Sequence, residues 1–213
     1  MSSPLEHIKA FALKCFANSR GSHDWEHTHR VYNLCMRIGK VEGAEMEVLK
    51  FAAYLHDVGR PHQDESKGTI CHAEKGAEMA STLLEEHPIP PDQKANIIHC
   101  IRSHRFRGKW KPKTLEAKIL FDADKLDAIG AIGIGRAFQF AGEMGAKLHN
   151  PDISPEHTEA YTEEDTGYRE FKLKLSKIKD RMLTDEGRRM ARERHAFMET
   201  FFERFLQEYK GYK

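Results

Sequence analysis

Apolar residues recur every three to four positions along most of the chain, which is the period of an amphipathic helix. We find no stretch with the strict alternation that is typical of a half-buried strand. Turn residues separate the periodic segments, as in "HPIPP" at 87–91 and "HNPDISPE" at 149–156. The pattern therefore predicts an all-α fold with helices at about 4–18, 23–41, 45–58, 71–87, 91–105, 114–128, 129–147, 155–183 and 186–210.

The segment "MEVLKFAAYLHDV" at 46–58 is apolar on nearly every side, which is typical of a fully buried helix. His56 and Asp57 lie at its end. Burying a carboxylate is costly unless a partner compensates its charge. This segment is the first indication of a functional site.

The length and composition limit the class of protein. A chain of 213 residues suits one domain of the larger common size. We predict a single compact helical domain over 1–213, with a metal-binding core at about 20–140. The long amphipathic helices at about 155–210 are expected to pack on this core.

Several classes are disfavoured by the same composition. The net charge of +1 argues against a polyanion binder that acts through bulk charge. No apolar run is long enough to span a membrane, and the N-terminus lacks the features of a signal peptide. The four cysteines are scattered, which is typical of reduced thiols. We therefore expect a cytoplasmic protein that does not contact a membrane.

Histidine is the unusual feature of the composition, with 13 residues. Helical phase separates those that point toward the core from the others. His27 shares a face with Val31, Leu34 and Ile38, whereas His29 points elsewhere and His23 lies at the helix start. The same test places a set of polar residues on or beside apolar faces of five helices: His27, His56, Asp57, His72, His104 and Asp124.

Each of these residues alone has an ordinary structural interpretation. An inward histidine is often a hydrogen-bonded core residue, and an aspartate can cap a helix or pair with arginine. The convergence of six is harder to explain, because buried carboxylates repel each other unless a cation lies between them. Asp127 shares the stripe of Asp124, and Asp122 lies off it. Both are alternative ligands.

The ordered pieces "SHDWEHTHRV", "AAYLHDVGR", "HAEKGAEMA", "IRSHRF" and "ILFDADKLDAIGAIGIGRAF" resemble the HD superfamily of metal-dependent phosphohydrolases, and its small bacterial members most of all. The resemblance implies a helical HD-domain bundle. It also implies that the metal ligands are His27, His56, Asp57 and Asp124, the residues that helical phase selects independently. By the same resemblance, His72 and His104 either bind a second metal or contact substrate phosphates.

A set of two histidines and two aspartates favours Mn, Fe, Co, Ni or Mg as one divalent ion, and does not exclude zinc. Such an ion activates water and polarises a phosphoryl oxygen, and Asp57 can orient that water as the catalytic carboxylate. We expect His72, His104, Lys125 and Arg136 to bind the substrate. The basic stretch "RSHRFRGKWKPK" at 102–113 either rims the site or is a solvated loop.

We therefore expect a phosphohydrolase that cleaves a phosphoester or phosphoanhydride of a small nucleotide. Resemblance adds that some small members release pyrophosphate from nucleoside triphosphates, and others cleave monophosphates. The alternative is a nucleic-acid-binding module with a structural metal site, which the balanced charge disfavours. A cyclic-dinucleotide phosphodiesterase is disfavoured because "HDVGR" lacks the Gly-Tyr-Pro extension of that branch. The oligomeric state is either a monomer or a homodimer.

Overall fold

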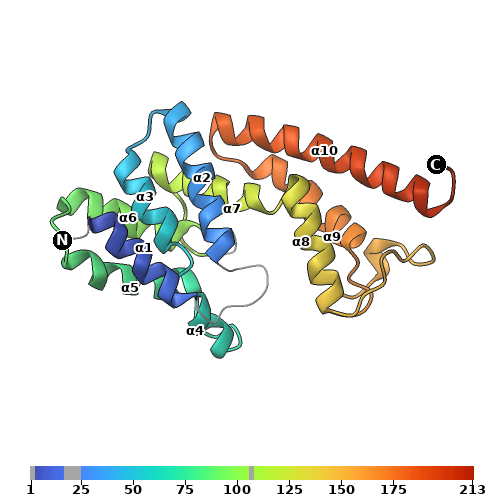
Figure 1. Cartoon of the computed structure of the whole chain (residues 1–213), viewed down its shortest axis with the longest axis horizontal. Coiled ribbons are helices and arrows are strands. Elements are labelled where there is room, and N and C mark those ends of the chain that lie inside the picture. The colour runs from blue at the N-terminus through green and yellow to red at the C-terminus, as the bar shows by residue number, and fades with distance from the viewer. Residues whose placement is uncertain (1–2, 17–24, 106–107) are drawn as a thin grey trace. The chain divides into compact units, whose positions relative to one another are not determined.

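The computed structural model of the protein describes residues 3–16, 25–105 and 108–213. All regular elements in these ranges are helices, which confirms the all-α prediction (Figure 1). The α-helices are α1 (Pro4–Cys15), α2 (Trp25–Glu42), α3 (Met46–Leu55), α4 (Arg60–Glu65), α5 (His72–Glu85), α6 (Pro91–Ser103), α7 (Leu115–Asp127), α8 (Gly130–Glu143), α9 (Gly167–Leu173) and α10 (Asp185–Tyr209). Two 3₁₀ helices, η1 (Pro155–His157) and η2 (Leu175–Arg181), complete the set.

The chain divides into two compact units, Met1–Asp124 and Lys125–Lys213. In the first unit, α3 is the central element and packs against α1, α2, α5 and α6. All its residues from Phe51 to Leu55 are buried, as the all-round apolar pattern predicts. Enclosure of α3 on every side explains why the chain that leaves its C-terminal end is also buried.

The second unit is built from α8, α9, η2 and α10, which pack on one another around aromatic side chains. Phe171 of α9 stacks on Phe202 of α10 with ring centroids 4.5 Å apart, and Phe138 of α8 lies 6.2 Å from Phe202. Aromatic pairs at such separations add to the free energy gained from burying their area. The apolar face of the long helix α10 is therefore accounted for within this unit.

The predicted helix at 155–183 is wrong. The segment instead contains η1, a loop, α9 and η2. Thr166 ends the loop as the N-cap of α9, where its side chain accepts a hydrogen bond from the Arg169 backbone N–H. The Arg169 guanidinium also binds the Asp165 carboxylate at 2.7 Å and the Thr158 carbonyl at 3.0 Å. These contacts stabilise a loop that helical periodicity alone cannot indicate.

The gap between the predicted helices at 45–58 and 71–87 contains the short helix α4, which begins at Arg60 and has Pro61 in its first turn. Proline suits this position because the first helical N–H groups have no partner inside the helix.

Across the described part of the chain, no helix combines the length and the apolar character that a membrane span requires.

Candidate metal centre

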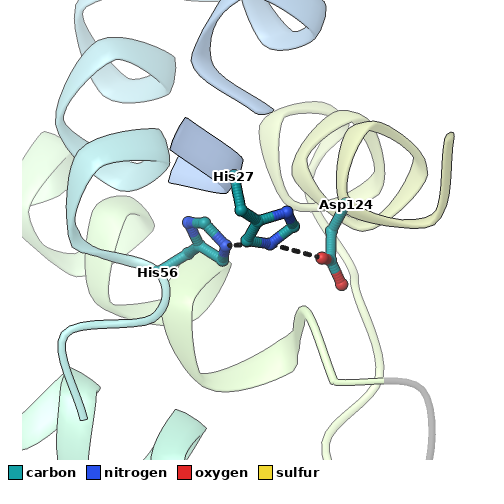
Figure 2. A group of neighbouring side chains, drawn as sticks. All are labelled: His27, His56 and Asp124. Atoms are coloured by element: carbon teal, nitrogen blue, oxygen red, sulfur yellow. Dashed lines mark hydrogen bonds and ion pairs between the residues drawn. The ribbon is translucent and has the colours of Figure 1, made fainter. Parts of the chain in front are cut away.

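Three side chains from three helices form a first group in the unit Met1–Asp124. His27 comes from α2, His56 follows the last residue of α3, and Asp124 lies in α7 (Figure 2). His27 Nε2 is 3.4 Å from His56 Nε2 and 3.3 Å from Asp124 Oδ1. Ligands of a first-row divalent ion lie roughly 2 Å from it, so neighbouring ligands are about 3 Å apart. The group therefore has the spacing of a metal site.

A second group lies beside the first and is buried more deeply. Asp57 Oδ1 is 3.4 Å from His72 Nε2 and 3.4 Å from His104 Nε2. The two Nε2 atoms lie 3.2 Å from each other. Asp57, His72 and His104 are each at most 3% exposed. Solvent water therefore has little access to the Asp57 carboxylate and screens its charge poorly.

Asp57 connects the two groups through its two carboxylate oxygens. Oδ1 faces His72 and His104, whereas Oδ2 lies 3.9 Å from His27 Nε2 and 3.8 Å from His56 Nε2. A single carboxylate can thus contribute to both groups. The residues that sequence reasoning placed in the metal set are together in space, with His72 and His104 beside them.

The hydrogen bonds of the other ring nitrogens fix how the histidines face these groups. His56 Nδ1 donates to the Ala53 carbonyl at 2.8 Å, His104 Nδ1 to the Ile101 carbonyl at 2.6 Å, and His72 Nδ1 to Gln63 Oε1 at 2.8 Å. With the proton on Nδ1, each Nε2 presents a lone pair to the carboxylates. This is the arrangement in which metal-binding histidines are held by outer partners.

Burial keeps two of these rings neutral. It lowers the pKa of His56 to about 4 and that of His72 to about 2, because charging an imidazole away from water is unfavourable. Neutral rings and ionised carboxylates are the protonation states that bind a metal. Lone pairs and negative oxygens that face each other at 3.2–3.9 Å repel, so the donor set fits a bound cation.

A glycine allows the second group to form. A Cβ atom at Gly59 would lie 2.3 Å from the His72 carbonyl oxygen and 2.6 Å from the Gly76 backbone nitrogen. The chain after Asp57 therefore crosses the first turn of α5 at a distance that only glycine permits. In "HDVGR", the glycine brings the histidine of α5 within reach of the aspartate.

Sequence reasoning missed the role of Arg60 and Gln63 on α4. Arg60 is not among the site residues predicted from the sequence, yet its Nη2 lies 3.2 Å from both oxygens of Asp57. Gln63 lies in the gap between the predicted helices at 45–58 and 71–87. The spacing of three residues between Asp57 and Arg60 was the available signal, because it suits a pair on one helical turn.

The remaining residues that the sequence analysis considered for the site differ in their contacts and in their burial. Lys125 follows Asp124 in α7, and Arg136 of the second unit binds the Asp127 carboxylate at 2.8 Å. Asp122 is fully buried although it lies off the predicted stripe, because α7 is enclosed on several sides. His29 is exposed, as its helical phase predicts.

The basic stretch is partly engaged by neighbouring side chains. Arg105 donates to Cys71 Sγ at 3.3 Å, and Lys109 and Trp110 contact the Glu74 carboxylate at 2.9 and 3.2 Å. Phe106 and Arg107 of this stretch lie outside the described residues, as do His23 and Asp24 of the first motif. The stretch is therefore tied to α5, the helix that begins with His72.

Comparisons with known proteins identify the relatives of this chain. A model of the HD domain matches residues 24–129, close to the predicted core. The protein YpgQ of Bacillus subtilis is 32% identical over 211 residues, covering 97% of this chain and 94% of YpgQ. Ribonuclease Y of Bacillus subtilis is 31% identical over 121 residues, which cover 57% of this chain but 21% of that protein.

Solved structures show the same fold over nearly the whole chain. The crystal structure of YpgQ in complex with ADP has a TM-score of 0.73 and 30% identity, covering 96% of this chain and 94% of that one. An HD-superfamily hydrolase from Bacillus thuringiensis has a TM-score of 0.77 and 30% identity, covering 97% and 96%. These similarities extend through both compact units.

Proposed function

Because this chain belongs to the HD superfamily of hydrolases, we propose that it is a divalent-metal-dependent phosphohydrolase acting on a small nucleotide. The observation that carries the proposal is the cluster of imidazole nitrogens and carboxylate oxygens around Asp57. Such a cluster favours a cation. The complex of YpgQ with ADP supports a nucleotide as the ligand.

His27, His56, Asp57 and Asp124 would hold the resident divalent ion. When bound, this ion supplies Lewis-acid chemistry by activating a water molecule and polarising a phosphoryl oxygen. Manganese is our first choice, since nitrogen and oxygen donors without thiolate suit it. Iron, cobalt, nickel and magnesium remain alternatives.

The chain's own residues supply orientation and charge. Asp57 is buried and held by Arg60, so its carboxylate is fixed in direction and can accept a hydrogen bond from the attacking water. His72 and His104 offer nitrogens on the other side of Asp57, where they bind either substrate phosphate or a second ion. Lys125 and Arg136 are our candidates for phosphate binding, and for Arg136 this requires sharing its guanidinium with Asp127.

The test is hydrolysis of a nucleotide panel by metal-loaded protein. Nucleoside mono-, di- and triphosphates are incubated with added Mn²⁺, and phosphate and pyrophosphate are measured separately. We expect turnover of at least one nucleotide and its loss in Asp57→Asn. His29→Gln is the matched control, because His29 lies two residues from His27 on the exposed side of α2. Absence of turnover on the whole panel by protein of verified metal content would refute the proposal.

The similarity to Ribonuclease Y supports a second candidate, hydrolysis of a phosphodiester in RNA. It covers only 121 residues, and the balanced net charge gives a polyanion little long-range attraction. A short single-stranded RNA in the same panel decides the matter. Cleavage of RNA with no release of phosphate or pyrophosphate from nucleotides would favour the second candidate.

A further inference from the structure

The Arg60 guanidinium lies in the second group of donors. Its Nη2 is 3.2 Å from Oδ1 and 3.2 Å from Oδ2 of Asp57, and 3.3 Å from His72 Nε2. The backbone N–H of Arg60 also donates to the Asp57 carbonyl at 2.8 Å where α4 begins, so the two residues are linked through both main chain and side chain. The guanidinium is thus part of the local fold.

The partners of Nη2 are those that a metal ion would take. An ion in the second group would bind Asp57 Oδ1, His72 Nε2 and His104 Nε2, which lie near one another. Arg60 Nη2 contacts two of these three atoms. The His72 ring donates from Nδ1 to Gln63, so its Nε2 accepts from the guanidinium. The guanidinium and an ion cannot use the same lone pairs together.

We propose that Arg60 is a built-in competitor for a second metal ion, occupying the cation position of the Asp57–His72–His104 group until an ion displaces it. The guanidinium balances the Asp57 charge when the second group holds no metal. Its side chain is 15% exposed, so it has a path toward solvent when displaced. This inference rests on the metal centre of the proposed function and is independent of the substrate.

The test is a calorimetric titration of metal-free protein with Mn²⁺. Elemental analysis after dialysis against a fixed concentration of free Mn²⁺ gives the number of bound ions. In Arg60→Met, which keeps length but removes charge and donors, we expect the second ion to bind ~10-fold or more tightly than in the original protein. Binding of the first ion should change much less. Arg60→Lys keeps a charge and should fall between the two.

Arg105→Met is the matched control for loss of a nearby positive charge, because the Arg105 guanidinium donates to Cys71 Sγ at 3.3 Å, at the start of α5. We expect it to change the second affinity less than Arg60→Met does. Equal effects of the two substitutions, an unchanged second affinity in Arg60→Met, or a single ion in every protein would each overturn the proposal. These results do not depend on nucleotide turnover, so they separate this proposal from the proposed function.

A measurement on the unsubstituted protein covers the case in which Arg60→Met fails to fold. The side-chain ¹⁵N signals of arginine are followed during titration with diamagnetic Zn²⁺, an ion that suits imidazole nitrogen and carboxylate oxygen donors. We expect the Arg60 signal to shift with the second equivalent of metal. A signal that stays constant through both equivalents would contradict displacement.

Discussion

The Nε2 atoms of His72 and His104 lie 3.2 Å apart, although each ring already donates from its Nδ1 to an oxygen. Two lone pairs at this distance repel unless a cation or a shared proton lies between them. Asp57 Oδ1, 3.4 Å from both nitrogens, adds negative charge at the same point. The fold therefore brings together atoms that are stable side by side only around positive charge.

Replacing Asp57 should reduce metal binding more than replacing any other predicted ligand, because its two carboxylate oxygens face both groups. We expect Asp57→Asn to lower metal content and to reduce turnover by ~100-fold or more, since even outer partners of metal ligands contribute 10- to 100-fold. Asp124→Asn should weaken the first ion and affect the second less. Elemental analysis and nucleotide assays measure both effects. Full metal retention in both variants would contradict the ligand assignment.

Gln63 should control the second group through His72. Replacing it with leucine removes the oxygen that accepts from His72 Nδ1, so the ring loses the partner that orients it. We expect Gln63→Leu to weaken the second ion by ~10- to 100-fold, as measured by calorimetry. Gln63→Glu keeps an acceptor and should retain affinity. A loss of equal size in both variants would show that the amide does not act by orienting His72.

Gly59 should tolerate no side chain. In Gly59→Ala, the added methyl group would meet backbone atoms of His72 and Gly76, so we expect a loss of about 2 kcal/mol or more in the free energy of unfolding. Gly135→Ala in α8 is the control, because its Cβ would meet nothing within 4 Å and alanine favours a helix. Urea unfolding compares them. A Gly59→Ala protein as stable as the original would disprove the close crossing.

The stability of the metal-free protein should depend on pH through His56. In the unfolded chain His56 binds a proton near its ordinary pKa of 6.5, but in the folded protein burial lowers this pKa to about 4. The unfolded state therefore binds more protons between these values, and the free energy of unfolding should fall as pH decreases across this range.

The contribution of this one residue is on the order of 3 kcal/mol, which is the linkage value of a pKa difference of this size. Urea unfolding at several pH values measures the slope, and His56→Asn should make it shallower. Parallel slopes for the two metal-free proteins would show that His56 is not the group that resists protonation.

Helical phase was sufficient to predict much of the site from the sequence. His27 lies on the single apolar face of α2 and is buried, and Asp124 lies on the predicted stripe of α7 with its side chain 15% exposed. His56 and Asp57 follow a helix that is apolar on every side. In each case burial is a local property of the pattern. Asp122 shows the limit, since it is buried by the enclosure of α7 and not by its own stripe.

The rest depended on contacts between segments distant in the sequence, or on short elements. Gln63 contacts His72 across the close approach of the chain at Gly59 to the first turn of α5. Neither the residue type nor the position of Gln63 in the sequence indicates a functional role. The loop before α9 is stabilised by Arg169, which binds Thr158 eleven positions earlier. The spacing of apolar residues over 155–183 is that of a continuous helix, and this spacing contains no information about contacts between side chains distant in the sequence.

The pairing of Asp57 with Arg60 bears on when the protein acquires its metal. A buried carboxylate whose charge is already balanced does not oblige the chain to recruit an ion before it folds. Ions would then be selected by a finished cavity with fixed donors, and geometry would count for more than raw affinity in that selection. On this basis, the metal found in a preparation reflects which ions the folded protein met, and replacing that metal after purification should not require refolding.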